Sequence, residues 1–261
     1  MAERAMSILD KILATKRDEV AAIDRERVRT AAIEVPPARP FRASLRRQPG
    51  GPVRAIAEIK RASPSAGAIR ANADPVAIAF EYAANGASAI SVLTDRTYFA
   101  GDLTFLTRVR DAVPTPVLRK DFLIDEIQVA EARAAGADAV LLIAAALPGN
   151  RLGDMMQCVR AFRMDALVEV HDEGELDVAL AAGATLVGVN HRDLTTFAID
   201  MTLTERIARR VTGDVVLVAE SGIRTADDVR RLGDAGAHAI LVGEHLMRAA
   251  SPGAALAELL A

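Results

Sequence analysis

The sequence predicts a parallel α/β fold, the (β/α)8 or TIM barrel, preceded by an N-terminal helical extension. Four helical patterns end in a Gly-Ala pair, with the glycine at positions 86, 136, 183 and 236, so that the spacings are 50, 47 and 53 residues. Glycine is typical of a helix C-cap, and a short apolar run follows each pair while another precedes it. Residues 53–261 therefore divide into eight units of roughly 26 residues, and strict alternation at that length favours parallel strands closed into a barrel.

Apolar runs of strand length mark the eight strands, at residues 54–60, 89–93, 117–120, 139–143, 167–170, 186–189, 215–220 and 239–242. Stretches with helical apolar spacing mark the helices, at residues 75–85, 103–112, 126–135, 151–163, 172–182, 201–210, 226–234 and 252–260. An open doubly wound sheet is the alternative. It is disfavoured because no Gly-x-Gly-x-x-Gly motif follows a strand and no phosphate-loop Gly-Lys pair occurs.

Residues 1–52 lie outside the eightfold pattern. They begin with an amphipathic helix whose apolar residues are Ile8, Ile12, Leu13, Val20 and Ile23, and a connector rich in Pro and Arg follows. We expect this helix to cover one end of the barrel. The whole chain, 1–261, is then one domain, with the barrel at 53–261.

Composition excludes several classes of partner. The 32 Lys and Arg against 35 Asp and Glu give a formal charge of -3, which lacks the basic excess of nucleic-acid-binding domains, and aromatic residues make up only 3%. The apolar run at 139–148 is too short to span a membrane, and the first residues lack an apolar signal core. With Cys158 as the single cysteine, we expect a soluble cytoplasmic protein without disulfides and without a membrane or nucleic-acid partner.

Polar and charged residues stand where five of the expected strands end. Glu58 and Lys60 share the inward face of the first strand with Ile56, because side chains alternate along a strand. Later strand ends contribute Lys120, Glu169, Asn190, Glu220 and Ser221. The carboxyl ends of barrel strands carry the active site, so these groups are expected on one rim.

The charges on this rim favour proton transfer. The structural alternative for a pair such as Glu58 and Lys60 is an internal salt bridge, but burying a charge costs several kcal/mol unless it is well paired. Burial and neighbouring charges can move the pKa of both Lys and Glu toward neutral pH, and lysine can release a proton where arginine cannot. Only four of the 32 basic residues are lysines, and two of them stand at strand ends.

The last two strands are each followed by glycine ahead of a helix, in Ser221-Gly222-Ile223 and Gly243-Glu244-His245. This is the usual place of phosphate in such barrels. The four histidines show no metal-ligand spacing, Cys158 lies in an expected helix, and no Gly-x-Ser-x-Gly elbow occurs, so we assign them no chemistry.

Several segments on successive strand ends together resemble the indole-3-glycerol-phosphate synthase family. They are EIKRASPS at 58–65, LTD at 93–95 with YFxG at 98–101, RKDF at 119–122, EVHD at 169–172, NHRDL at 190–194, AESGI at 219–223, and LVG at 241–243 with LM at 246–247. The likeness extends from about residue 5 to residue 250, and the joint order of the segments makes it specific.

The resemblance implies a lyase of tryptophan biosynthesis that needs neither a metal nor an organic cofactor. Its substrate would be 1-(2-carboxyphenylamino)-1-deoxyribulose 5-phosphate, which is ring-closed, decarboxylated and dehydrated to indole-3-glycerol phosphate. Lys120 would be the general acid and Glu169 the general base of the later proton removal. Lys60 would bind the anionic substrate, with the division of acid duty between the lysines open, and Glu58 and Asn190 would orient these groups.

The resemblance also implies the binding residues. Substrate would be positioned by Phe122, Arg192, Glu220 and Ser221, and phosphate held by Ser63, Gly222 and Gly243. Glu244 departs from the serine of some family members, and an acid facing phosphate would repel it; if its side chain turns outward, the backbone amides still serve. We further expect a monomer whose partner is the phosphorylated small molecule, with association with other tryptophan-pathway enzymes as an option.

Two other functions remain as alternatives. A phosphoribosyl isomerase would share the fold and the anion-binding loops but needs a different acid–base pair from Lys60, Lys120 and Glu169. A non-catalytic barrel that binds a phosphorylated metabolite would bind tightly without turnover, and it gains little from three buried glutamates.

Overall fold

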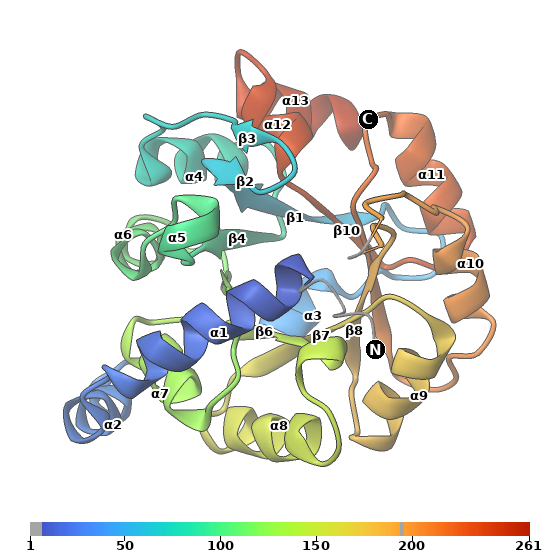
Figure 1. Cartoon of the computed structure of the whole chain (residues 1–261). Helices are drawn as coiled ribbons and strands as arrows, with labels where there is room; N and C mark the ends of the chain where they lie inside the picture. Colours follow the sequence, from blue (N-terminus) through green and yellow to red (C-terminus); the bar gives the residue numbers. More distant parts are fainter. Residues whose placement is uncertain (1–6, 194–195) are drawn as a thin grey trace.

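Eight parallel strands form a closed barrel in the computed structural model, which describes residues 7–193 and 196–261 (Figure 1). The strands are β1 (Arg54–Ile59), β4 (Ala89–Leu93), β5 (Val117–Lys120), β6 (Ala139–Ile143), β7 (Asp165–Val170), β8 (Leu186–Asn190), β9 (Val216–Glu220) and β10 (Ala239–Val242). They pair in chain order, and β1 closes the barrel against β10. The predicted fold class is confirmed.

Helices cover the outside of the barrel. Those that follow the strands are α4 (Pro75–Ala84), α6 (Leu103–Ala112), α7 (Glu126–Ala134), α8 (Arg151–Ala161), α9 (Glu173–Ala181), α10 (Leu203–Ala208), α11 (Ala226–Asp234) and α13 (Pro252–Leu259). Residues typical of helix N-caps begin three of these helices. The side chains of Asp125, Asp172 and Thr225 accept backbone hydrogen bonds at the starts of α7, α9 and α11. All eight helices match the expected ranges to within two residues at either end.

Several short elements lie outside the expected pattern. They are the strands β2 (Ala62–Ser63) and β3 (Gly67–Ala68), the helices α5 (Arg96–Phe99) and α12 (Glu244–Arg248), and the 3-10 turn η1 (Ala144–Ala146). Elements of two to five residues are too short for apolar periodicity to reveal them. Each follows a barrel strand, so these elements build the loops around the mouth of the barrel.

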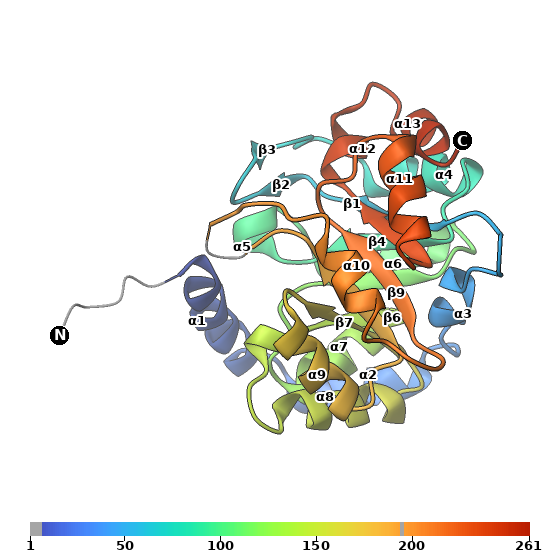
Figure 2. The ribbon, with the colours of Figure 1, turned by 90° about the vertical axis from the view of Figure 1, so that its right-hand side faces the viewer.

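The N-terminal extension holds three helices, α1 (Ile8–Ala21), α2 (Arg25–Glu34) and α3 (Phe41–Leu45). The expectation of a connector after the first helix was wrong, because α2 packs on α7 and α3 closes the barrel. Phe41 and Leu45 of α3 are fully buried and join the apolar side chains inside the barrel. Figure 2 shows α1 and α3 at opposite ends of the barrel.

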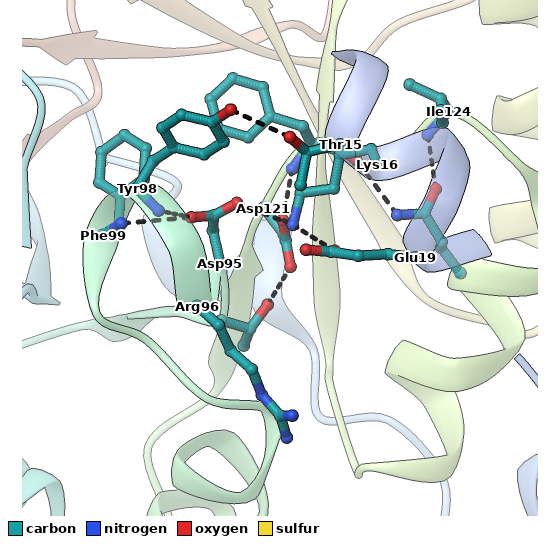
Figure 3. A network of polar contacts seen from close by, with 12 residues as sticks. Thr15, Lys16, Glu19, Asp95, Arg96, Tyr98, Phe99, Asp121 and Ile124 are labelled. Carbon is teal, nitrogen blue, oxygen red and sulfur yellow. Dashed lines mark hydrogen bonds and ion pairs between the residues drawn. The ribbon is translucent and has the colours of Figure 1, made fainter. Parts of the chain in front are cut away.

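Helix α1 lies at the carboxyl ends of the strands, as Lys16 makes clear (Figure 3). The Lys16 ammonium lies 2.8 Å from Asp95, 2.9 Å from Asp121 and 2.8 Å from Glu19, and the side chain is 1% exposed. Asp121 directly follows β5, and Asp95 lies two residues after the end of β4. The predicted first helix therefore reaches the mouth of the barrel, while the opposite end is closed by α3.

Side chains inside the barrel alternate as the strand pattern predicts. Ile56, Leu118 and Leu167 belong to the inner core, while Ala57 and Ile59 pack between the strands and the helices. The charged residues in phase with the inner set therefore enter the mouth of the barrel. Within the described residues, the structure contains no helix long and apolar enough to cross a membrane.

Candidate active site

A cavity of about 580 Å³ opens at the carboxyl ends of the barrel strands. All twelve predicted site residues line it: Glu58, Lys60, Ser63, Lys120, Phe122, Glu169, Asn190, Arg192, Glu220, Ser221, Gly222 and Gly243. Leu194, the last residue of one motif, lies outside the described residues. The structure thus brings the predicted residues together, and their contacts define what each can do.

Lys120 lies between two buried carboxylates at the centre of the cavity. Its Nζ is 2.9 Å from Oε2 of Glu169 on β7 and 2.6 Å from Oε2 of Glu220 on β9. Burial alone would lower the pKa of Lys120, but the charges of Glu169, Glu220 and Glu58 raise it above its ordinary value. Lys120 is therefore a cation at neutral pH.

The two glutamates beside Lys120 have opposite pKa shifts. Burial alone would raise the pKa of Glu169, but Lys120 and His171 bring it below its ordinary value. Burial raises the pKa of Glu220 to about 7. The charge of Lys120 lowers this pKa and only partly offsets the effect of burial, while the charge of Glu169 raises the pKa further. The expectation that Lys and Glu both move toward neutral pH is wrong for Lys120 and Glu169, since each stabilises the charged form of the other. It holds for Glu220.

A second ion pair lies across the mouth. Lys60 Nζ is 3.0 Å from Oε1 of Glu58, and the Ser91 hydroxyl donates to Oε2 of Glu58 at 3.1 Å. Although burial would raise the pKa of Glu58, Lys60 and Lys120 lower it. The structural alternative of an internal salt bridge is thus present, but Lys60 is 18% exposed and still faces the cavity.

Asn190 connects the carboxylates to the anion loop. Its Nδ2 donates to Oε1 of Glu169 at 3.2 Å, and its Oδ1 accepts from the Ser221 hydroxyl at 2.8 Å and from the backbone N–H of Arg192 at 3.1 Å. The amide is therefore fixed on both sides and holds Glu169 in place.

Two histidines without an assigned role contact this set. His191 donates through Nδ1 to the carbonyl of Ser221 at 2.9 Å and accepts from Thr204 at 2.7 Å, so its role is structural. His171 instead lies 3.4 Å from Oε1 of Glu169. The contact between His171 and Glu169 was missed from the sequence, because the histidines were considered only as metal ligands. Glu175, four residues after His171, was the signal that this histidine has a charged partner.

Glycines make room for the buried glutamates. A Cβ at Gly188 would lie 2.2 Å from Oε1 of Glu220, and one at Gly243 would lie 2.6 Å from Oε1 of Glu58. Nothing in the sequence singled out Gly188. A glycine is required there only because the pairing of β8 with β9 brings the Glu220 side chain against it. Gly243 belongs to the anion loop and also leaves room for the side chain of Glu58.

Replacing Gly188 with alanine should lower the free energy of unfolding by about 1 to 3 kcal/mol, since the added methyl displaces a buried carboxylate. Urea unfolding measures the change. The matched control is Gly153→Ala in α8, where a Cβ meets nothing within 4 Å and alanine is the better helix former. Equal stability of the two variants would contradict the close packing at Gly188.

The anion loops are shaped by backbone strain after β9 and by a side-chain hydrogen bond after β1. Ser221 and Gly222 both have positive φ, at 69° and 81°, which turns the chain sharply after β9. Ser63 accepts the N–H of Ala66 at 3.1 Å within the loop after β1. Glu244 pairs with Arg248 at 3.0 Å, and its side chain is 37% exposed, so its carboxylate has a cationic partner beside the cavity.

One wall of the cavity is apolar. Phe99 and Phe122 lie with ring centroids 6.0 Å apart, and Leu141, Ile143 and Leu241 also line the cavity. Helix α1 adds Ile8 and Ile12, which were predicted only as apolar residues of an amphipathic helix, and Leu9, which was not among the predicted residues. The cavity therefore offers a surface for a planar apolar group beside two cations and a proton acceptor.

Comparisons with known proteins agree with this geometry. Residues 9–259 match the family model described as indole-3-glycerol phosphate synthase. Proteins named indole-3-glycerol phosphate synthase are 50% identical in Desulfotalea psychrophila, over 97% of this chain and 98% of that protein, and 50% identical in Laribacter hongkongensis, over 97% and 99%. The solved N-acetylmannosamine-6-phosphate 2-epimerase from Clostridium perfringens shares the fold, with a TM-score of 0.62 at 15% identity over 79% of this chain and 90% of that one.

Proposed function

The chain belongs to the indole-3-glycerol phosphate synthase family, and from this premise we propose that it makes indole-3-glycerol phosphate by general acid–base catalysis. Family members are carboxy-lyases of tryptophan biosynthesis. The substrate would be 1-(2-carboxyphenylamino)-1-deoxyribulose 5-phosphate. The observation that supports this best is Lys120, a cation held between an ionised base and a second buried carboxyl at the centre of the cavity.

The first step is ring closure. The aromatic carbon that bears the carboxylate attacks the ribulose carbonyl, and Lys120 donates a proton to the carbonyl oxygen as the new carbon–carbon bond forms. Carbon dioxide then leaves, and its bonding electrons restore the aromatic ring. Lys60, 18% exposed at the mouth, would balance the substrate's negative charge.

The second step is dehydration. A proton from Lys60 or Lys120 makes the hydroxyl leave as water, while Glu169 removes the proton whose loss completes the indole ring. Two protons are given and one is taken, so one is consumed overall. This balance agrees with the loss of a carboxylate as carbon dioxide.

The remaining residues position the substrate. Asn190 and Glu58 hold the acid and base in place through their own hydrogen bonds and ion pairs. Phe122 would contact the carboxyphenyl ring, and Arg192, Glu220 and Ser221 would contact the ribulose chain; all four line the cavity. Phosphate would lie against Ser63 at the end of β2 and against Gly222 and Gly243, which stand ahead of α11 and α12.

Product masses distinguish this function from its rivals. The purified protein, incubated with the carboxyphenylamino substrate, should give a product lighter by one carbon dioxide and one water. A phosphoribosyl isomerase would give a product of unchanged mass, and a binding-only barrel would return the substrate. Either of the last two results would overturn the proposed function.

A further inference from the structure

His171 joins the proposed base to a carboxylate nearer the surface. It follows β7 directly, two residues after Glu169, and its Nε2 lies 3.4 Å from Oε1 of Glu169. On the other side its Nδ1 is 3.1 Å from Oε2 of Glu175 in the first turn of α9, and its backbone N–H donates to the same oxygen at 2.8 Å. The side chain of His171 is 10% exposed and that of Glu175 is 23% exposed.

The charges around Glu169 change during the proposed reaction. At rest its carboxylate is balanced by Lys120 at 2.9 Å. Once Lys120 has given its proton to the substrate, Glu169 faces the neutral amine, the Asn190 amide and the carboxyl group of Glu220. A second cation is needed if Glu169 is to remain an ionised acceptor for the later proton removal.

We propose that His171 is a positioning residue whose protonated imidazole keeps Glu169 ionised and oriented after Lys120 has released its proton. This inference rests on the proposed role of Glu169 as general base. It extends that role to a residue that touches no reacting atom.

The surroundings of His171 support a permanent cation. The charged groups that face it are Glu169 on β7 and Glu175 on α9, and the adjacent turn η1 carries only alanines. Burial alone would lower the pKa of His171, but these two carboxylates raise it to about 10. The imidazole thus stays charged at the pH at which Lys120 and Glu169 would act.

The contact to Glu169 is electrostatic. Among the described residues Nε2 of His171 has no hydrogen-bond partner, although it lies within ion-pair distance of Oε1. That oxygen accepts from Asn190 at 3.2 Å, and Oε2 faces Lys120. His171 therefore stabilises the charge of Glu169 without occupying the oxygen that meets Lys120.

Histidine titration by NMR tests the charge without any substrate. The chain has four histidines, and the His171 signal is the one missing from His171→Gln. We expect the imidazole to stay protonated through pH 8, and its titration midpoint to fall by at least one pH unit in Glu169→Gln. A wild-type midpoint near the ordinary 6.5, or a midpoint that ignores Glu169→Gln, would overturn the inference.

The pH profile of turnover tests the role. An opposite charge at this distance shifts a carboxyl pKa by about 1 to 3 units. His171→Gln should therefore move the acid limb of kcat to higher pH by at least half a unit, with KM within about twofold, whereas Glu175→Gln, which leaves a protonated imidazole beside Glu169 at acid pH, should not raise that limb. The control is Asp177→Asn, which removes an exposed partner of Arg210 from the same helix and should leave the profile unchanged.

A His171→Gln profile that superimposes on the wild type would overturn the inference. If His171→Gln does not fold, Glu175→Gln decides through the NMR titration, because it keeps the imidazole and should lower the midpoint of His171; an unchanged midpoint would overturn the inference. A wild-type protein without turnover would count against the proposed function, while the NMR titration still decides the charge of His171.

Discussion

Replacing Lys120 with methionine should lower kcat by about 10²- to 10⁴-fold, with a much smaller change in KM, because a positioned general acid contributes on that scale. The variant loses the proton donor and also leaves Glu169 and Glu220 without the cation between them. Their pKa values should then rise, which weakens the proposed base as well. Steady-state kinetics measures both parameters.

Lys120→Arg separates proton donation from charge. Arginine keeps the positive charge beside Glu169 and Glu220 but does not release its proton. We expect it to lose activity nearly as fully as the methionine variant, while circular dichroism shows an intact fold. An arginine variant with a tenth or more of wild-type kcat would show that Lys120 acts only through its charge.

Replacing Lys16 with methionine should lower the free energy of unfolding by about 3 to 5 kcal/mol, since breaking a buried ion pair leaves an uncompensated charge. Lys16 fixes α1 to Asp95 and Asp121, which are 0% and 3% exposed. Figure 3 shows how Lys16 lies between these groups. Urea unfolding measures the loss, and exposed Lys11 on the same helix supplies the control Lys11→Met.

The contribution of Lys16 should depend on pH. Burial alone would raise the pKa of Asp121, but Arg119 and Lys16 lower it. A carboxylate whose pKa is lowered in the folded protein stabilises the fold at pH values above its ordinary pKa, which is 3.8 for Asp121. That stabilisation is lost as the pH falls below 3.8. Wild type and Lys16→Met should therefore converge in acid. A constant difference between them, or equal stability of Lys16→Met and Lys11→Met at neutral pH, would contradict this assignment.

The barrel could be predicted from the sequence because its strands and helices repeat a pattern that depends only on neighbouring residues. Alternation along β1 placed Ile56, Glu58 and Lys60 inside, where the structure has them. Helix α3 was missed because its two core residues, Phe41 and Leu45, are too few to show a period. Their burial depends on the inner barrel that they close.

The site was predictable where one strand end carries an unusual residue type, as at Lys120 and Glu169. It was not predictable where the role of a residue depends on a neighbour in space. Gly188 matters because Glu220 on the adjacent strand fills the place of its Cβ. The direction of the Lys120 pKa shift likewise needs the distances to Glu169 and Glu220, since burial alone gives the opposite sign.

The amounts of carbon dioxide and of indole product released in a single turnover test the proposed roles of Lys120 and Glu169 most directly. The wild type should release the two in equal amounts, and Lys120→Met should release neither on the same timescale. Glu169→Gln should still release carbon dioxide but form little indole, because ring closure and decarboxylation precede the proton removal assigned to Glu169. Parallel loss of carbon dioxide and indole in Glu169→Gln, or full indole formation, would contradict Glu169 as the base of the last step.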